Sequence, residues 1–162
     1  MRYETEVSDD QKLPPASGPG EETPFSRTLP GRGELIIVVD DDDILRRAIA
    51  RMLKSLGFAV LTAADGIDAI TVIENCPRAI DCLLVDVVMP HLNGPELVER
   101  LASRGIHIGV IYMSGYDDAT IVTHLMNSPT MPLLRKPFTP QALMLVLREV
   151  LSRKGARQPN GC

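Results

Sequence analysis

The sequence predicts an α/β protein in which five helices cover both faces of a doubly wound, five-stranded parallel sheet. Two observations predict this class. Five apolar runs alternate along the chain with segments whose apolar residues recur at helical spacing. The runs are unbroken rather than alternating, as in parallel strands that are buried on both faces. Right-handed crossovers between such strands give a doubly wound sheet, which binds ligands at the carboxyl ends of its strands.

The five expected strands are short runs of mainly apolar residues. In chain order they are ELIIVVD (34–40), FAVLTA (58–63), IDCLLVD (80–86), IHIGVIYMSG (106–115) and PLLRK (132–136). The first and third have the same form, since each apolar run ends in a carboxylate, Asp40 or Asp86. The fourth and fifth end near Ser114 and Lys136. We expect these polar strand ends to meet at one edge of the sheet.

The expected helices are bounded by capping and breaking residues. Asp43 can cap the first helix, and Gly57 stops it. The second helix is expected from about Asp65 to Asn75, because Pro77 prevents its continuation. The last three helices are expected to begin around Gly94 and Pro95, to cover DDATIVTHLMN (117–127), and to open at Thr139 and Pro140.

A single folded domain is expected from about residue 34 to residue 153. Residues 1–33 are about one quarter proline and glycine and lack an apolar period, which predicts a flexible arm. Residues 154–162 form a short polar tail. A chain of 162 residues then leaves no room for a second core.

Composition excludes several classes of protein. The net charge of -4 argues against direct nucleic acid binding, which usually requires a basic patch. No apolar run is long enough to span a membrane, and the amino terminus lacks an apolar signal segment, so a cytoplasmic location is expected. The three cysteines form no CxxC pair, and the three histidines are too scattered for a metal cluster.

The acidic strand ends suggest a metal site with phosphoryl chemistry. Four consecutive aspartates, Asp40 to Asp43, follow the first strand, and Asp86 ends the third. Carboxylates that converge on one edge make an oxygen-rich site suited to Mg²⁺, whose charge offsets their repulsion. A carboxylate beside Mg²⁺ can attack phosphorus to form an acyl phosphate. Lys136 and the Ser114 hydroxyl can then bind phosphoryl oxygens.

The same residues resemble the receiver domains of two-component response regulators, particularly those attached to hybrid histidine kinases. VVDDDDILRR resembles the acidic segment of the family, and LLVDVVMPHLNG its phosphorylation loop. VIYMSGYDD resembles the strand with the switch hydroxyl, and LLRKPFTPQAL the Lys-Pro-Phe segment. The resemblance covers essentially all of residues 34–153. It implies a flavodoxin-like fold with strand order 2-1-3-4-5.

The resemblance also assigns roles to individual residues. Asp86 matches the phosphoacceptor, Ser114 the switch hydroxyl and Lys136 the family's lysine. The metal ligands implied for Mg²⁺ are Asp41, Asp86, the backbone carbonyl of Val88 and, through water, Asp40. Asp42 and Asp43 lie outside this set, and we interpret this pair as providing the helix cap and solvated charge rather than metal ligands. The family often has a cis peptide bond before the matching proline, so Lys136-Pro137 is a candidate.

Two positions depart from the family pattern. Leu133 replaces the tyrosine or phenylalanine often found three residues before the lysine, so the switch cannot use an aromatic ring there. Val88 places an apolar side chain where other members have polar groups that orient water. Slow self-dephosphorylation is therefore expected.

The function implied is that of a single-domain response regulator. It would receive a phosphoryl group from a histidine kinase or a histidine phosphotransfer protein, without being an enzyme acting on other substrates. Binding of a downstream protein would change on the face formed by the fourth helix, the fifth strand and the fifth helix.

Two alternatives remain open. Asp40 and Asp42 form a DxD motif, which a haloacid dehalogenase-type magnesium phosphatase would use with Asp40 as the nucleophile. A phosphorylation-independent pseudo-receiver would serve only as a docking module, although the complete acidic site weighs against it.

Overall fold

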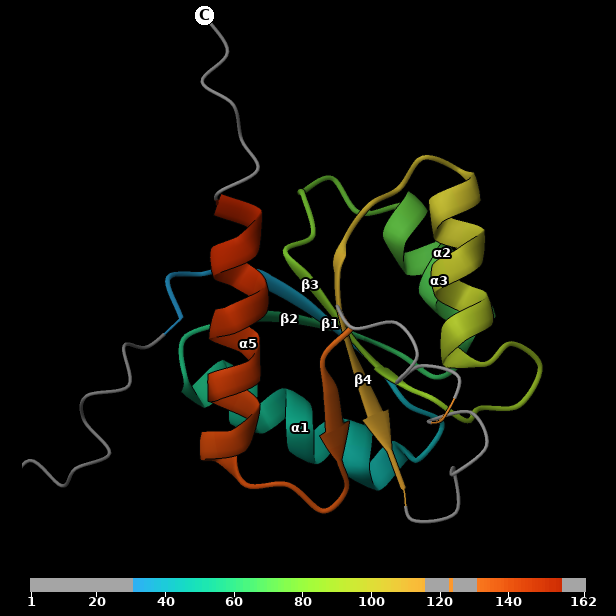
Figure 1. Cartoon of the computed structure of the whole chain (residues 1–162). Helices are drawn as coiled ribbons and strands as arrows, with labels where there is room; N and C mark the ends of the chain where they lie inside the picture. Colours follow the sequence, from blue (N-terminus) through green and yellow to red (C-terminus); the bar gives the residue numbers. More distant parts are fainter. Residues whose placement is uncertain (1–30, 116–122, 124–130, 156–162) are drawn as a thin grey trace, which may run out of the picture.

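A computed structural model of the chain describes residues 31–115, 123 and 131–155 (Figure 1). Five parallel strands form one sheet in the order β2-β1-β3-β4-β5. They are β1 (Leu35–Val39), β2 (Ala59–Ala63), β3 (Cys82–Asp86), β4 (Gly109–Ser114) and β5 (Leu133–Arg135). The predicted fold class and strand order are therefore confirmed.

The fourth strand begins later than the sequence suggests. Its expected start was Ile106, whereas β4 begins at Gly109. The backbone N–H of Ile106 donates to the carbonyl of Leu101, in the last turn of the preceding helix. Ile106 therefore closes that helix, and its apolar side chain is not evidence of a strand.

Four helices lie within the described residues. They are α1 (Asp43–Ser55), α2 (Gly66–Glu74), α3 (Gly94–Ser103) and α5 (Pro140–Gly155). The expected helix over 117–127 falls almost entirely outside the described residues. A capping box between Asn93 and Glu96 stabilises the start of α3. At the start of α5, the Oγ1 of Thr139 accepts a hydrogen bond from the N–H of Ala142.

The cap of α1 is Asp42, not Asp43 as expected. Asp42 has an extended backbone, and its Oδ1 accepts from the N–H groups of Ile44 at 2.9 Å and Leu45 at 3.0 Å. Asp43 is already helical and forms ion pairs with Arg46 and Arg47. The cap falls one residue earlier because the backbone turns into the helix at Asp42, where its oxygen can reach the free N–H groups.

The hydrophobic core consists of one layer on each face of the sheet. Figure 1 shows α1 and α5 on one side, and α2 and α3 on the other. The residues of β1 and β3 are all buried, because these strands lie inside the sheet and are covered on both faces. β2 is an edge strand with two exposed residues. The helices of the described residues are all too short or too polar to cross a membrane.

The folded part makes contacts from Gly31 onward, three residues before the expected domain boundary. The N–H groups of Gly31 and Gly33 donate to the carbonyls of Leu56 and Gly57. Gly57 has a positive φ of 89°, and a Cβ there would lie 2.6 Å from the Gly31 oxygen. Glycine is thus required both for the turn after α1 and for this close approach.

Strand register brings the polar strand ends together. Val39 pairs with Val85, so Asp40 and Asp86 leave neighbouring strands side by side. Ser114 pairs with Arg135, which immediately precedes Lys136. Since all five strands are parallel, these ends lie at one edge of the sheet, as predicted.

Candidate phosphoacceptor and metal site

Three carboxylates meet at the carboxyl edge of β1 and β3. Asp40, Asp41 and Asp86 each offer an oxygen that lies within 4.8 Å of the others. Asp40 and Asp86 are buried, whereas Asp41 is exposed. The structure thus brings together the three side chains that the sequence predicts as metal ligands.

Asp40 is the most constrained member of this group. Its Oδ1 accepts from the N–H of Asp42 at 2.9 Å, and its Oδ2 from Lys136 Nζ at 2.7 Å. Its own N–H donates to the Ala63 carbonyl on β2. A fully buried carboxylate requires such partners, because an unpaired charge in the interior is costly.

Asp86 has weaker support on one of its two oxygens. Oδ2 accepts from Lys136 Nζ at 2.8 Å, while Oδ1 accepts from the Val88 N–H at 3.3 Å. Burial raises the pKa of Asp86 above its ordinary value, and the negative charge of Asp40 raises it too, although the bond and charge of Lys136 act in the opposite direction. Of the two buried carboxylates, Asp86 is thus the one whose charge the fold satisfies less well.

Lys136 bridges the two buried carboxylates. Its side chain is 18% exposed and forms ion pairs with both Asp40 and Asp86. Burial acts to lower the pKa of Lys136, but the bonds to the two carboxylates outweigh burial and raise it. The Lys136-Pro137 peptide bond is cis, in agreement with the sequence-based expectation.

Ser114 supplies an unpaired hydroxyl at the same edge. Ser114 is fully buried, and its Oγ has no hydrogen-bond partner among the described residues. Leaving a buried hydroxyl unpaired costs about 1–3 kcal/mol, so most such groups have partners. An oxygen-rich ligand at this edge would provide the missing partner.

The loop after β3 approaches Asp86 through Gly94. A Cβ at Gly94 would lie 2.4 Å from the Asp86 carbonyl oxygen, and the Gly94 N–H donates to the Val87 carbonyl. The start of α3 can therefore lie against the end of β3 only with glycine here. Val88, whose carbonyl is an expected ligand, lies in this loop and is 46% exposed.

Arg46 also contacts this edge, although no motif in the sequence assigns it a role there. Its Nη1 donates to the carbonyl oxygen of Asp40 at 2.6 Å. The signal available in the sequence was its spacing, one helical turn after the acidic run. Residues three and four apart in a helix share a face, so the spacing places Arg46 near Asp42 and Asp43.

The donor set fits a hard divalent cation. Carboxylate oxygens, with room for water on the exposed side of Asp41, match the preference of Mg²⁺ for oxygen ligands and retained waters. Lys136 leaves the group with an excess of negative charge, since it is one cation bonded to two of three carboxylates. The site therefore has both the ligands and the charge to attract such an ion.

Comparison with known proteins identifies the family of the chain. A family model described as response regulator receiver domain matches residues 36–148. The transcriptional regulatory protein FixJ of Azorhizobium caulinodans is 36% identical over 119 residues, which cover 72% of this chain and 54% of that protein. The sensor histidine kinase RcsC of Salmonella typhi is 37% identical over 113 residues, covering 70% of this chain and 12% of that protein.

Solved structures of response regulator receiver proteins are also similar to this chain. A response regulator receiver domain protein from Clostridium thermocellum has a TM-score of 0.69 and 28% identity, covering 77% of this chain and 99% of that one. A response regulator receiver protein from Burkholderia phymatum has a TM-score of 0.63 and 35% identity, covering 74% and 95%.

The fold and the comparisons define the class of protein: a receiver module of two-component signalling. The chain belongs to the response regulator receiver domain family. It spans about half of FixJ and about an eighth of RcsC, so the relatives contain regions beyond the one they share with this chain.

Proposed function

We propose that this chain is a response regulator receiver that accepts a phosphoryl group on Asp86 in a Mg²⁺-dependent reaction. The observation that carries the proposal is the convergence of Asp40, Asp41 and Asp86 with Lys136 at one edge. The donor would be a phosphohistidine of a histidine kinase or a histidine phosphotransfer protein. Receiver domains interact with such proteins, and RcsC is itself a sensor histidine kinase by name.

The reaction requires an exposed oxygen and charge compensation. An Asp86 oxygen attacks phosphorus, the P–N bond of the phosphohistidine breaks, and its electron pair stays on the imidazole nitrogen, which takes up a proton. Oδ1 is the more available oxygen, because its bond to Val88 is the longer one. Lys136 can follow the new charge, since its Nζ already lies 2.8 Å from Asp86 Oδ2.

A bound Mg²⁺ would neutralise charge on the transferred group. Asp41, Asp86 and the Val88 carbonyl would hold it, with Asp40 contributing through a water. No other substrate is turned over, and the phosphoryl group leaves by slow self-dephosphorylation. The exposed apolar side chain of Val88 supports slow loss, because it offers no polar atom to orient a water molecule.

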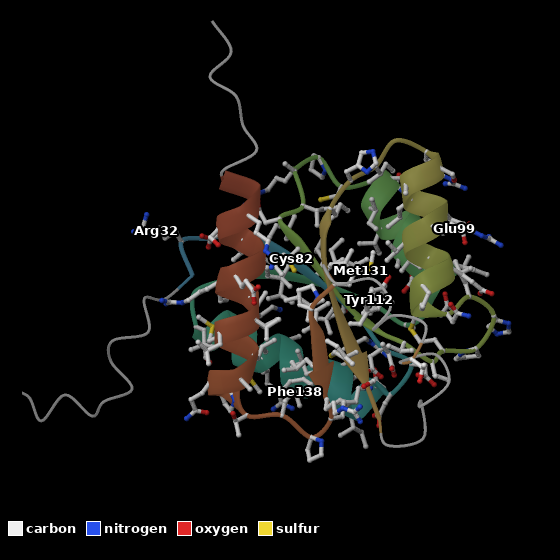
Figure 2. All side chains as sticks on the ribbon, in the orientation of Figure 1. Arg32, Cys82, Glu99, Tyr112, Met131 and Phe138 are labelled. Atoms are coloured by element: carbon white, nitrogen blue, oxygen red, sulfur yellow. The ribbon has the colours of Figure 1, made fainter. Side chains whose placement is uncertain are left out.

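Ser114 is the proposed link between phosphorylation and output. Its unpaired Oγ can donate to a phosphoryl oxygen, which would draw the end of β4 toward Asp86. Leu133 pairs with Tyr112 in the β4–β5 register, so both lie on the Ser114 face of the sheet. Figure 2 shows Tyr112 among the interior side chains, and burial raises its pKa to about 12.

A downstream protein would bind the surface formed by the helix expected over 117–127, β5 and α5. The helix lies almost wholly outside the described residues, but α5 presents Leu145 with 72% exposure. Ser114→Ala should abolish the difference in partner affinity between the two phosphorylation states. Leu133→Ala should retain that difference and mainly lower stability, because Leu133 packs on the core and carries no polar group.

The phosphatase alternative is less well supported. It requires Asp40 as the nucleophile, yet Asp40 is fully buried and both of its oxygens accept hydrogen bonds of 2.9 Å or less. Asp86 has the longer bond and the greater exposure. A docking module that needs no phosphorylation would not require the three carboxylates and Lys136 to converge.

The test is incubation with acetyl phosphate and Mg²⁺, followed by mapping of the modified residue. We expect one base-labile phosphoryl group on Asp86, which Asp86→Asn abolishes. Asp42→Asn is the matched control, because it changes a nearby aspartate but keeps the oxygen that caps α1. A phosphoryl group on Asp40 would instead establish the phosphatase alternative. If the protein is natively folded but takes up no phosphoryl group, the docking-module alternative is the one that stands.

A further inference from the structure

Arg46 is a nearly buried cation beside the acidic site. It lies in the first turn of α1, and its side chain is only 13% exposed. Arginine is seldom buried to this extent unless its N–H groups are paired. Nη1 donates to the Asp40 carbonyl oxygen and Nη2 to Asp43 Oδ1, both at 2.6 Å. The guanidinium therefore ties the end of β1 to the beginning of α1.

The bonded carbonyl belongs to the peptide group that joins Asp40 to Asp41. A peptide group is planar, so fixing its oxygen also fixes the N–H of Asp41. The direction of the Asp41 side chain then depends on fewer free rotations.

Asp41 needs such backbone support more than Asp40 does. Asp41 is exposed, and no described residue donates a hydrogen bond to its carboxylate. Asp40, in contrast, is held through both carboxylate oxygens. Within the described part of the chain, the orientation of Asp41 is therefore set mainly by the backbone that precedes it.

We propose that Arg46 is a positioning residue for the metal site: it fixes the Asp40–Asp41 peptide group and so keeps the Asp41 carboxylate directed toward Asp86. The inference rests on the proposed function, because the ion concerned is the Mg²⁺ of the phosphoacceptor site. It adds a residue that touches neither the metal nor the phosphoryl group.

Charge alone predicts the opposite effect. A guanidinium beside the site repels a divalent cation, so its removal should tighten metal binding. Positioning predicts that its removal weakens binding, and the sign of the change separates the two. Arg47 is the matched control, because its Nε pairs with the same Asp43 at 3.0 Å while its side chain is 72% exposed and has no contact with Asp40 among the described residues.

The experiment is calorimetric titration of the full chain with MgCl₂. Arg46→Met should raise the Kd for Mg²⁺ about 10-fold, the lower end of the range for residues that orient metal ligands. Arg46→Lys should fall between native and Arg46→Met, because an ammonium keeps the charge but lacks the two-pronged geometry. Arg47→Met should leave Kd unchanged or lower it. An unchanged or lower Kd in Arg46→Met overturns the proposal.

A double-mutant cycle identifies the residue through which Arg46 acts. In an Asp41→Asn background, Arg46→Met should have little further effect on Kd, because the oriented ligand is already altered. Equal effects in both backgrounds would overturn the proposal. If circular dichroism shows that Arg46→Met does not fold, Arg46→Lys is used in the same cycle. Native protein that binds no Mg²⁺ contradicts the proposed function itself, whereas tight native binding with unaffected Arg46 variants contradicts only the role of Arg46.

Discussion

Asp40 and Asp42 are the same residue type two positions apart, yet they contact different parts of the molecule. Asp40 is fully buried and accepts a hydrogen bond from Lys136, near the other end of the domain. Asp42 is exposed and accepts from Ile44 and Leu45 beside it. The strand end directs the first toward neighbouring strands, and the helix start directs the second toward free N–H groups. The position of each residue in the backbone, rather than its type, thus decides its role: Asp40 belongs to the candidate metal site, and Asp42 caps the helix.

The largest expected effect on stability comes from removing Lys136, the cation that pairs with the two buried carboxylates. Lys136→Met leaves Asp40 and Asp86 without their shared partner, and should lower the free energy of unfolding by about 3 kcal/mol. Arg135→Met is the control, since Arg135 is an exposed neighbour of equal charge and should cost about 0.5 kcal/mol or less. Urea unfolding without added metal measures both. Equal losses of stability in the two variants would mean that the ion pairs of Lys136 with Asp40 and Asp86 contribute no more than an exposed charge does.

The Lys136→Met deficit should shrink as the pH falls from neutral toward the ordinary aspartate pKa of 3.8. Burial already raises the pKa of Asp86, and loss of Lys136 removes the main influences that lower it. The folded variant therefore takes up a proton at a higher pH than the unfolded chain does, so stability is regained as the pH falls. Urea unfolding over this range tests the direction. A deficit that grows on acidification would contradict it.

Mg²⁺ should stabilise the protein through the exposed member of the site. Well above the Kd, each tenfold rise in Mg²⁺ adds about 1.4 kcal/mol to the free energy of unfolding. Asp41→Asn should weaken this response, because it removes a charged ligand from the group. Thermal unfolding across a series of Mg²⁺ concentrations measures it. The same slope and midpoint in Asp41→Asn would exclude Asp41 as a ligand.

A smaller effect on stability is expected at Asp42, the residue of the acidic run that caps α1. Asp42→Ala should cost about 1 kcal/mol of stability, the usual value for loss of a helix cap. Asp42→Asn keeps the capping oxygen and should cost less. Phosphorylation should persist in both variants, as measured by the acetyl phosphate assay. Loss of phosphorylation in Asp42→Asn would show that Asp42 takes part in the site after all.

The smallest effect is expected at Asp43. Asp43→Ala should cost about 0.5 kcal/mol, because the Asp43 side chain is 50% exposed, so solvent screens both its ion pairs and its favourable position at the helix start. Urea unfolding at two salt concentrations measures it. A loss larger than that of Asp42→Ala would reverse the order proposed for these two residues.

The sequence predicted the sheet because its strands carry unbroken apolar runs, and it predicted the strand ends because Asp40, Asp86, Ser114 and Lys136 terminate those runs. It placed the cap one residue late, since Asp42 and Asp43 are chemically identical and only backbone angles distinguish them. Arg46 escaped prediction for a related reason. A surface arginine and a buried one look alike in sequence, and the acceptor is a backbone carbonyl that carries no residue-specific signal.

The Lys136–Asp40 contact joins residues 96 positions apart. During synthesis the three aspartates emerge first, and the chain carries an acidic cluster without its lysine until β5 is added beside β4. Closing so long a loop is an entropic cost that only the assembled sheet can offset. The proposed ability of Asp86 to accept a phosphoryl group would therefore arise only after the last strand has joined the sheet.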